Sequence, residues 1–86
     1  MEFMVGQILL LPFKFQMRDL LPCDGRILNI NEHHVLFALI GSTYGGDGHS
    51  TFALPDLRSS VPNPNMQYYI ATYGIFPERY WLNNKI

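Results

Sequence analysis

The sequence has few cysteines and few charged residues, on which cross-linked small domains and most active sites depend. Its 86 residues include a single cysteine, Cys23, which excludes a disulfide within the chain and a cysteine-based zinc site. Only 15% of the residues are charged, and the six Lys and Arg residues are scattered along a chain of net charge −1. Because phosphate neutralisation requires a basic patch, we expect no nucleic-acid partner.

Long hydrophobic runs are missing as well. The apolar stretch near the amino terminus, from Val5 to Leu11, is far shorter than the ~20 residues that span a bilayer. The first residues lack a basic region and a small-residue cleavage site. We therefore expect neither a secretory signal peptide nor membrane insertion.

Apolar residues are abundant overall, at 48% of the chain, with 14% aromatic. A chain of this length forms a small core, so residues 1–86 are expected to make a single domain. The excess of apolar surface suggests burial against other chains, with the C-terminal segment 78–86 as an interface arm.

Strand-forming residues concentrate near the two ends of the chain. Residues 3–15 predict a strand whose pairing Pro12 limits, and residues 67–75 predict a second one that Pro77 ends. Each would expose an apolar edge on its own, so we expect these two strands to pair with each other.

The middle of the chain predicts a turn, a short strand and one helix. Residues 18–25 favour a turn, with Asp24-Gly25 as a hairpin signal, and residues 26–30 alternate as a strand does. Apolar spacing predicts a helix over about residues 32–40. Asn29 or Asn31 would cap its start, and Gly41 would end it.

After a glycine-rich loop, residues 51–54 are predicted to be extended and to stop at Pro55, and residues 61–65 form a Pro/Asn linker. Together these elements predict a compact α+β domain of short, mostly antiparallel strands with one helix, completed by oligomerisation.

No set of side chains has the spacing of a catalytic or metal site. His33 and His34 are adjacent and point in different directions on a helix, so they do not converge on one metal. Cys23 has an apolar setting that favours a buried small side chain over a nucleophile. We therefore predict a protein that is not an enzyme and needs no cofactor.

Two further motifs favour structural roles. The loop Tyr44-Gly-Gly-Asp-Gly48 supplies one carboxylate and lacks the phosphate-loop Lys, so it favours a turn in which Asp47 bonds its own backbone. Asp56 and Arg58, two residues apart, are expected to form an ion pair or to bond the preceding loop. The tyrosines and Trp81 of the C-terminal third favour packing and interface contacts over a sugar-stacking platform.

The order of these motifs is similar to one known family. Cys23-Asp24-Gly25-Arg26, then Leu28-Asn29-Ile30, then LFALIGSTYGGDGHSTFALPDLR from Leu36 to Arg58 resemble the phage tail collar domain. The resemblance extends from about Val5 to Arg79. The chain departs from the family pattern at Leu20-Leu21-Pro22, where a Gly-Trp pair is usual. It departs again after Arg58, where a Gly-rich insertion is replaced by Ser59, Ser60 and the short linker.

The resemblance implies a structural domain, commonly homotrimeric, found where fibres join tails or at fibre tips, with no cofactor and no catalytic residues. It assigns structural roles to Cys23, Asp24, Gly25, Gly41, Tyr44, Gly45, Gly46, Asp47, Gly48, Phe52, Leu54, Pro55, Asp56, Leu57 and Arg58. With the apolar excess, it makes these residues candidates for the interface: Phe3, Val5, Ile8, Leu10, Tyr69, Tyr73, Phe76, Tyr80 and Trp81.

The leading hypothesis is a structural protein of a phage tail, tail fibre or phage-derived particle. It would be made in the bacterial cytoplasm and would associate with itself as a trimer and with other tail or fibre proteins. No shaft or receptor-binding region flanks the domain in this sequence, so we expect a minimal collar module. The alternative is an adhesin or fibre-tip module that binds a bacterial glycan or protein, with Tyr73, Tyr80 and Trp81 as an aromatic platform near Asp47 and His49.

Overall fold

A computed structural model of the chain describes residues 3–12 and 17–76. It contains five short strands, mostly antiparallel, and one α-helix, so the predicted α+β class is confirmed. In chain order the elements are β1 (Ile8–Leu11), β2 (Leu20–Pro22), β3 (Ile27–Asn29), α1 (His34–Ile40), β4 (Thr51–Ala53), a 3₁₀ turn (Arg58–Ser60) and β5 (Gln67–Ala71).

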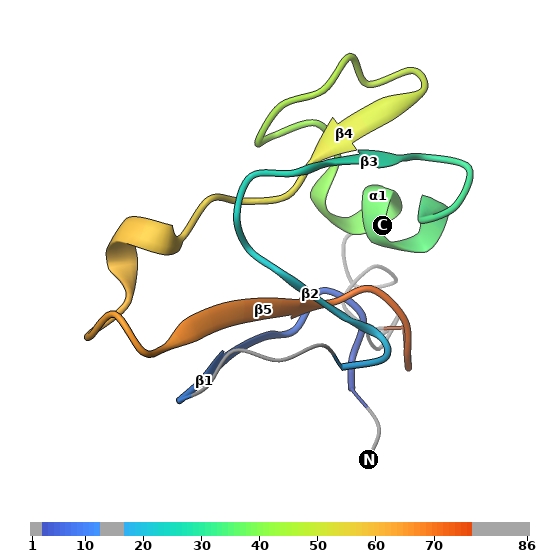
Figure 1. Ribbon diagram of the computed structural model, residues 1–86. Coiled ribbons are helices and arrows are strands. Elements are labelled where there is room, and N and C mark those ends of the chain that lie inside the picture. Colours follow the sequence, from blue (N-terminus) through green and yellow to red (C-terminus); the bar gives the residue numbers. More distant parts are fainter. Residues whose placement is uncertain (1–2, 13–16, 77–86) are drawn as a thin grey trace, which may run out of the picture.

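The larger sheet has three strands, with β5 in the centre between β1 and β2 (Figure 1). The expected pairing of the first and last strands is confirmed, since Ile8 lies opposite Ile70 in an antiparallel ladder. Both strands are shorter than predicted. Before β1, Gly6 turns the chain with φ 88°; after β5, the chain bends and Gly74 takes φ 146°.

The prediction of a turn over residues 18–25 is only partly right: residues 18–19 form a turn, but the prediction is wrong for residues 20–22. Residues 20–22 form β2, because Leu20 to Pro22 pair with Ala71 to Tyr69 of β5, some fifty positions away along the chain. Asp24-Gly25 makes no hairpin either. The chain continues directly from β2 into β3, which pairs with β4 in a second, two-stranded antiparallel sheet (Figure 1).

Helix α1 begins at His34, two residues later than predicted, and neither Asn29 nor Asn31 caps it. Its N-cap residue is His33, which makes no side-chain capping bond. The Asn29 side-chain oxygen instead accepts the N–H of Asn31 at 2.8 Å, which holds the preceding residues in a turn.

The end of the helix is as expected. Gly41 has φ 59°, and its N–H donates to the Phe37 carbonyl at 2.8 Å. A positive φ at this position suits glycine, which carries no Cβ.

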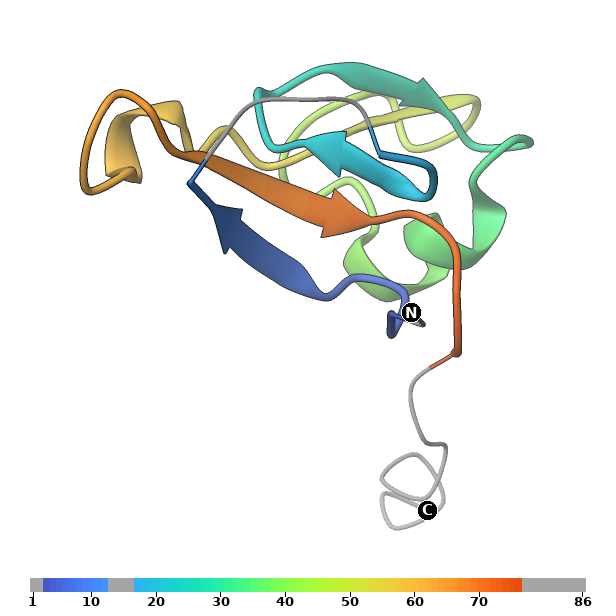
Figure 2. The ribbon, with the colours of Figure 1, turned by 60° about the horizontal axis from the view of Figure 1, so that its bottom comes forward.

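The core lies on both faces of β5. On one face Ile70 packs with Val5, Cys23, Leu36, Phe52 and Leu54. On the other face Tyr69 and Ala71 pack with Phe3 and Leu20. Helix α1 and the β3–β4 pair lie together on the first face, as Figures 1 and 2 show from two directions.

Candidate functional site

The glycine-rich loop between α1 and β4 is organised around the Asp47 carboxylate. Its Oδ1 accepts the N–H groups of His49, Ser50 and Thr51 at 2.8, 2.9 and 3.0 Å. Its Oδ2 accepts the Ser50 hydroxyl at 3.1 Å. These bonds favour the ionised form and hold the pKa of Asp47 well below its usual range. The predicted turn is confirmed, and the carboxylate is occupied by its own loop.

The glycines of this loop let its backbone lie directly on β4. Gly45, Gly46 and Gly48 all have positive φ, of 136°, 89° and 75°. A Cβ built on Gly46 would lie 2.7 Å from both the Phe52 nitrogen and the Thr51 oxygen. The loop therefore covers Phe52, which is fully buried and whose ring lies 5.4 Å from that of Phe37.

Two Asp-x-Arg motifs form matching ion pairs. Asp24 accepts two bonds from the Arg26 guanidinium, both at 3.0 Å, and Asp56 accepts two from Arg58 at 2.9 and 2.7 Å. In each motif the Asp also accepts the backbone N–H of its own Arg at 3.2 Å. Hydrogen bonding to Arg58 lowers the pKa of Asp56 to about 2. The sequence predicted the Asp56–Arg58 pair. The Asp24–Arg26 pair was not predicted, although its two residues have the same spacing.

The backbones of the two motifs lie side by side as an antiparallel brace between the two sheets. Asp24 forms an isolated antiparallel bridge with Asp56. On either side of it, the Leu57 N–H donates to the Cys23 carbonyl and the Leu54 N–H to the Arg26 carbonyl, both at 2.9 Å. The brace uses both arginines and both aspartates internally, so it offers no unpaired charge for a ligand.

Cys23 and the three histidines are the other side chains that could carry chemistry. Cys23 is fully buried, and burial, with the nearby Asp24 charge, raises the pKa of its thiol to about 11, which keeps it protonated. His34 and His49 are exposed and His33 is half-buried. Within residues 3–12 and 17–76, no three His, Cys, Asp or Glu side chains converge as metal ligands would.

The candidate interface residues have different placements. Phe3, Val5 and Tyr69 are buried in the core of the chain, and Leu10 is half-buried. Ile8, Tyr73 and Phe76 are exposed. Tyr80 and Trp81, with the arm 78–86, lie outside the described residues.

The exposed members belong to a larger apolar surface. Of seven large apolar side chains that are exposed in the described part of the chain, five come from residues 3–8 and 73–76. These five, which we call the terminal apolar surface, are Met4, Ile8, Tyr73, Ile75 and Phe76. The two segments lie side by side, because Met4 bridges Ile75 and the Ile75 N–H donates to the Phe3 carbonyl at 2.8 Å.

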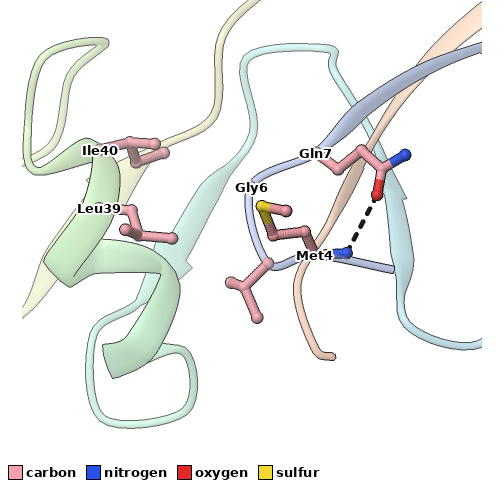
Figure 3. A pocket seen from close by; sticks show the side chains of 6 residues that line it. Met4, Gly6, Gln7, Leu39 and Ile40 are labelled. Carbon is pink, nitrogen blue, oxygen red and sulfur yellow. Dashed lines mark hydrogen bonds between the residues drawn. The ribbon is translucent and has the colours of Figure 1, made fainter. Parts of the chain in front are cut away.

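Beside this surface lies an apolar groove of about 480 Å³, between the N-terminal segment and the end of α1 (Figure 3). We call it the Met4 groove; its lining residues are Met4, Val5, Gly6, Gln7, Leu39 and Ile40. The Gln7 side-chain oxygen accepts the Met4 N–H at 3.0 Å. The Val5 N–H donates to the Ile75 carbonyl at 2.8 Å, so this wall of the groove is fixed by hydrogen bonds.

The described residues predicted for a glycan platform lie in two different regions of the structure. Residues 72–76 follow β5, the central strand of the larger sheet, whereas the loop that holds Asp47 and His49 lies above β4, at the other side of the molecule (Figure 1). Tyr73, within the first of these segments, is 72% exposed. Across the described ranges, no helix has the length and apolar character needed to cross a membrane.

Paired charges, a loop carboxylate bonded within its own loop and an exposed apolar surface are typical of a structural domain. The family model for the Phage Tail Collar Domain matches residues 6–62, and the chain belongs to this family. The resemblance predicted from the sequence is thereby confirmed. It is a structural family of phage tails and is not known for enzymatic activity. Comparisons with curated proteins and with solved structures gave no match.

Proposed function

We propose that this collar domain is a non-enzymatic structural protein of a phage tail fibre or phage-derived particle, and that it assembles with itself as a trimer and then with other tail or fibre proteins. Family membership supports the tail-fibre role. Trimerisation and contact with neighbouring tail proteins are inferred from the exposed side chains of the domain.

The terminal apolar surface is the observation that carries this proposal. Ile75, Met4 and Ile8 are 53%, 49% and 44% exposed in the single chain. Several apolar side chains exposed on neighbouring segments of a small domain favour an interaction site, and their burial contributes about 25 cal/mol per Å². A second copy that covers them would supply stabilisation that the small core of one chain lacks.

The test is the oligomeric state at micromolar concentration, measured by sedimentation velocity or mass photometry. We expect a trimer that dissociates on dilution, with Ile75→Glu shifted toward monomer. Ile27→Glu is the matched control, because Ile27 is equally exposed, at 56%, but lies on β3 in the other sheet. A well-folded wild-type monomer at these concentrations would contradict the proposal.

Recognition of a host surface glycan is the alternative function. The observation in its favour is Tyr73, the most exposed of the large apolar side chains in the described ranges. An aromatic ring of this kind can stack on a sugar, as interface aromatics do on apolar partners. Binding to a bacterial glycan array that Tyr73→Ala abolishes, while the oligomer stays intact, would support this alternative over a purely structural role.

A further inference from the structure

We propose that the Met4 groove holds the C-terminal arm, residues 78–86, of a second copy of this chain, with Trp81 as the anchor. This inference rests on the proposed self-association and names the contact that makes it. Arm exchange between identical chains is a low-cost route to assembly, because each copy offers the same arm and the same groove.

The groove has the size and chemistry of an aromatic-binding site. Its volume of about 480 Å³ lies within the ~300–1,000 Å³ of typical ligand pockets. Aliphatic side chains, Val5, Leu39 and Ile40, line it, and the Met4 thioether is well suited to contact an aromatic ring. Gln7 also lines the groove, and its amide oxygen accepts the Met4 N–H (Figure 3).

The arm supplies the matching side chains. Ten residues follow Phe76, and among them Tyr80, Trp81 and Leu82 form one continuous apolar triplet between polar neighbours. Aromatic residues of this kind bury ~150–250 Å² each and commonly anchor interfaces. The terminal apolar surface, from which the arm departs, adjoins the groove through Met4.

The course of the chain brings the start of the arm to the terminal apolar surface, where a second copy is proposed to pack. After β5 the segment 72–76 leaves the sheets (Figure 2) and runs beside residues 3–5, where the Ile75 carbonyl accepts the Val5 N–H. Tyr80 is four residues beyond Phe76, so an extended arm carries it up to ~14 Å further. The arm therefore begins at the surface on which a second copy would present its own groove.

The test uses full-length variants and the fluorescence of Trp81, which is the single tryptophan of the chain. Met4→Glu places a charge in the groove at a position already 49% exposed, and Ile27→Glu is the matched control outside it. We expect Met4→Glu to shift Trp81 emission to longer wavelength and to favour the monomer, with Ile27→Glu unchanged. Trp81→Ala should weaken association about 30-fold or more, as the loss of an interface anchor does.

Mixing the two variants distinguishes an arm that docks on a second copy from an arm that docks on its own chain. Met4→Glu chains keep the arm but lack an intact groove, whereas Trp81→Ala chains keep the groove and carry no tryptophan. Mixing the two should return the emission of Trp81 to shorter wavelength and form mixed oligomers. Emission that stays at long wavelength after mixing, or that Met4→Glu never changes, overturns the inference.

The oligomeric state separates this inference from the proposed function. If Trp81→Ala leaves the oligomer intact with unchanged affinity, arm exchange is refuted and self-association stands. If the wild-type protein is itself a monomer, the proposed function fails, and the arm-exchange inference fails with it.

Discussion

Replacing Gly46 by alanine should destabilise the domain more than any other glycine substitution in the loop between α1 and β4. Two effects add at this position. Gly46 has φ 89°, a conformation that costs a residue with a Cβ about 1–3 kcal/mol. The new Cβ would also lie 2.7 Å from the Phe52 nitrogen and the Thr51 oxygen, both backbone atoms that move only if β4 moves.

Gly41→Ala is the control that separates these effects. Gly41 also has a positive φ, of 59°, but nothing lies within 4 Å of a Cβ built there. Its substitution should cost only the backbone strain, about 1–3 kcal/mol. Gly46→Ala should exceed it and reach about 4 kcal/mol, because displacing β4 opens the packing around buried Phe52. The whole domain is expected to have roughly 4–13 kcal/mol of stability, so the variant would lose from about a third to nearly all of it.

The assay is urea denaturation followed by circular dichroism, at one fixed protein concentration because association also stabilises the fold. We expect both variants to lower the midpoint, with the larger change for Gly46→Ala. A Gly46→Ala midpoint equal to or above that of Gly41→Ala would refute the close approach of the loop to β4.

Four further outcomes are expected. Leu36→Ala, at a fully buried helix position, should cost about 2–5 kcal/mol in urea denaturation. Asp47→Asn should make the stability less sensitive to acid. The lowered pKa of Asp47 stabilises the fold above the unfolded pKa of about 4, and this stabilisation is lost as the pH falls below that value. The melting temperatures of the variant and the wild type should therefore converge between pH 5 and 2. Cys23, with a pKa near 11, should resist a thiol reagent at pH 8 until urea unfolds the chain; rapid labelling of the native protein would contradict its burial. Arg58→Gln should leave the urea midpoint almost unchanged, because its ion pair is exposed on both sides.

The sequence predicted those parts of the fold that depend on local chemistry. Asp47 among glycines predicts a side chain that bonds its own backbone, and the structure has this turn. Gly41 ends the helix for a similar reason, since its positive φ requires no information from elsewhere in the chain. The pairing of the two ends followed from their shared apolar character.

Most other features that depend on distant partners were not predicted, and one local feature, the start of α1, was also missed. Leu20-Leu21-Pro22 lies next to turn-forming residues, and it becomes a strand only because β5 lies alongside it. The start of α1 was misplaced because Asn29 makes a local turn in place of a cap. The Met4 groove was not foreseen, since residues 4–7 and 39–40 meet only in the folded chain.

The match to the collar family and the terminal apolar surface occupy different parts of the chain. Residues 6–62 contain the braced Asp-x-Arg motifs and the Asp47 loop, whose polar groups are used within the domain. Met4, Tyr73, Ile75 and Phe76 lie outside that range, and only Ile8 of the five exposed residues lies inside it. The matched range therefore contains the brace and the loop, although the central strand β5 lies outside it. The end segments, residues 3–5 and 72–76, carry four of the five side chains of the terminal apolar surface. Association depends on the surface that the domain presents. We therefore expect substitutions in these end segments to alter which partners bind, whereas substitutions in the brace should not.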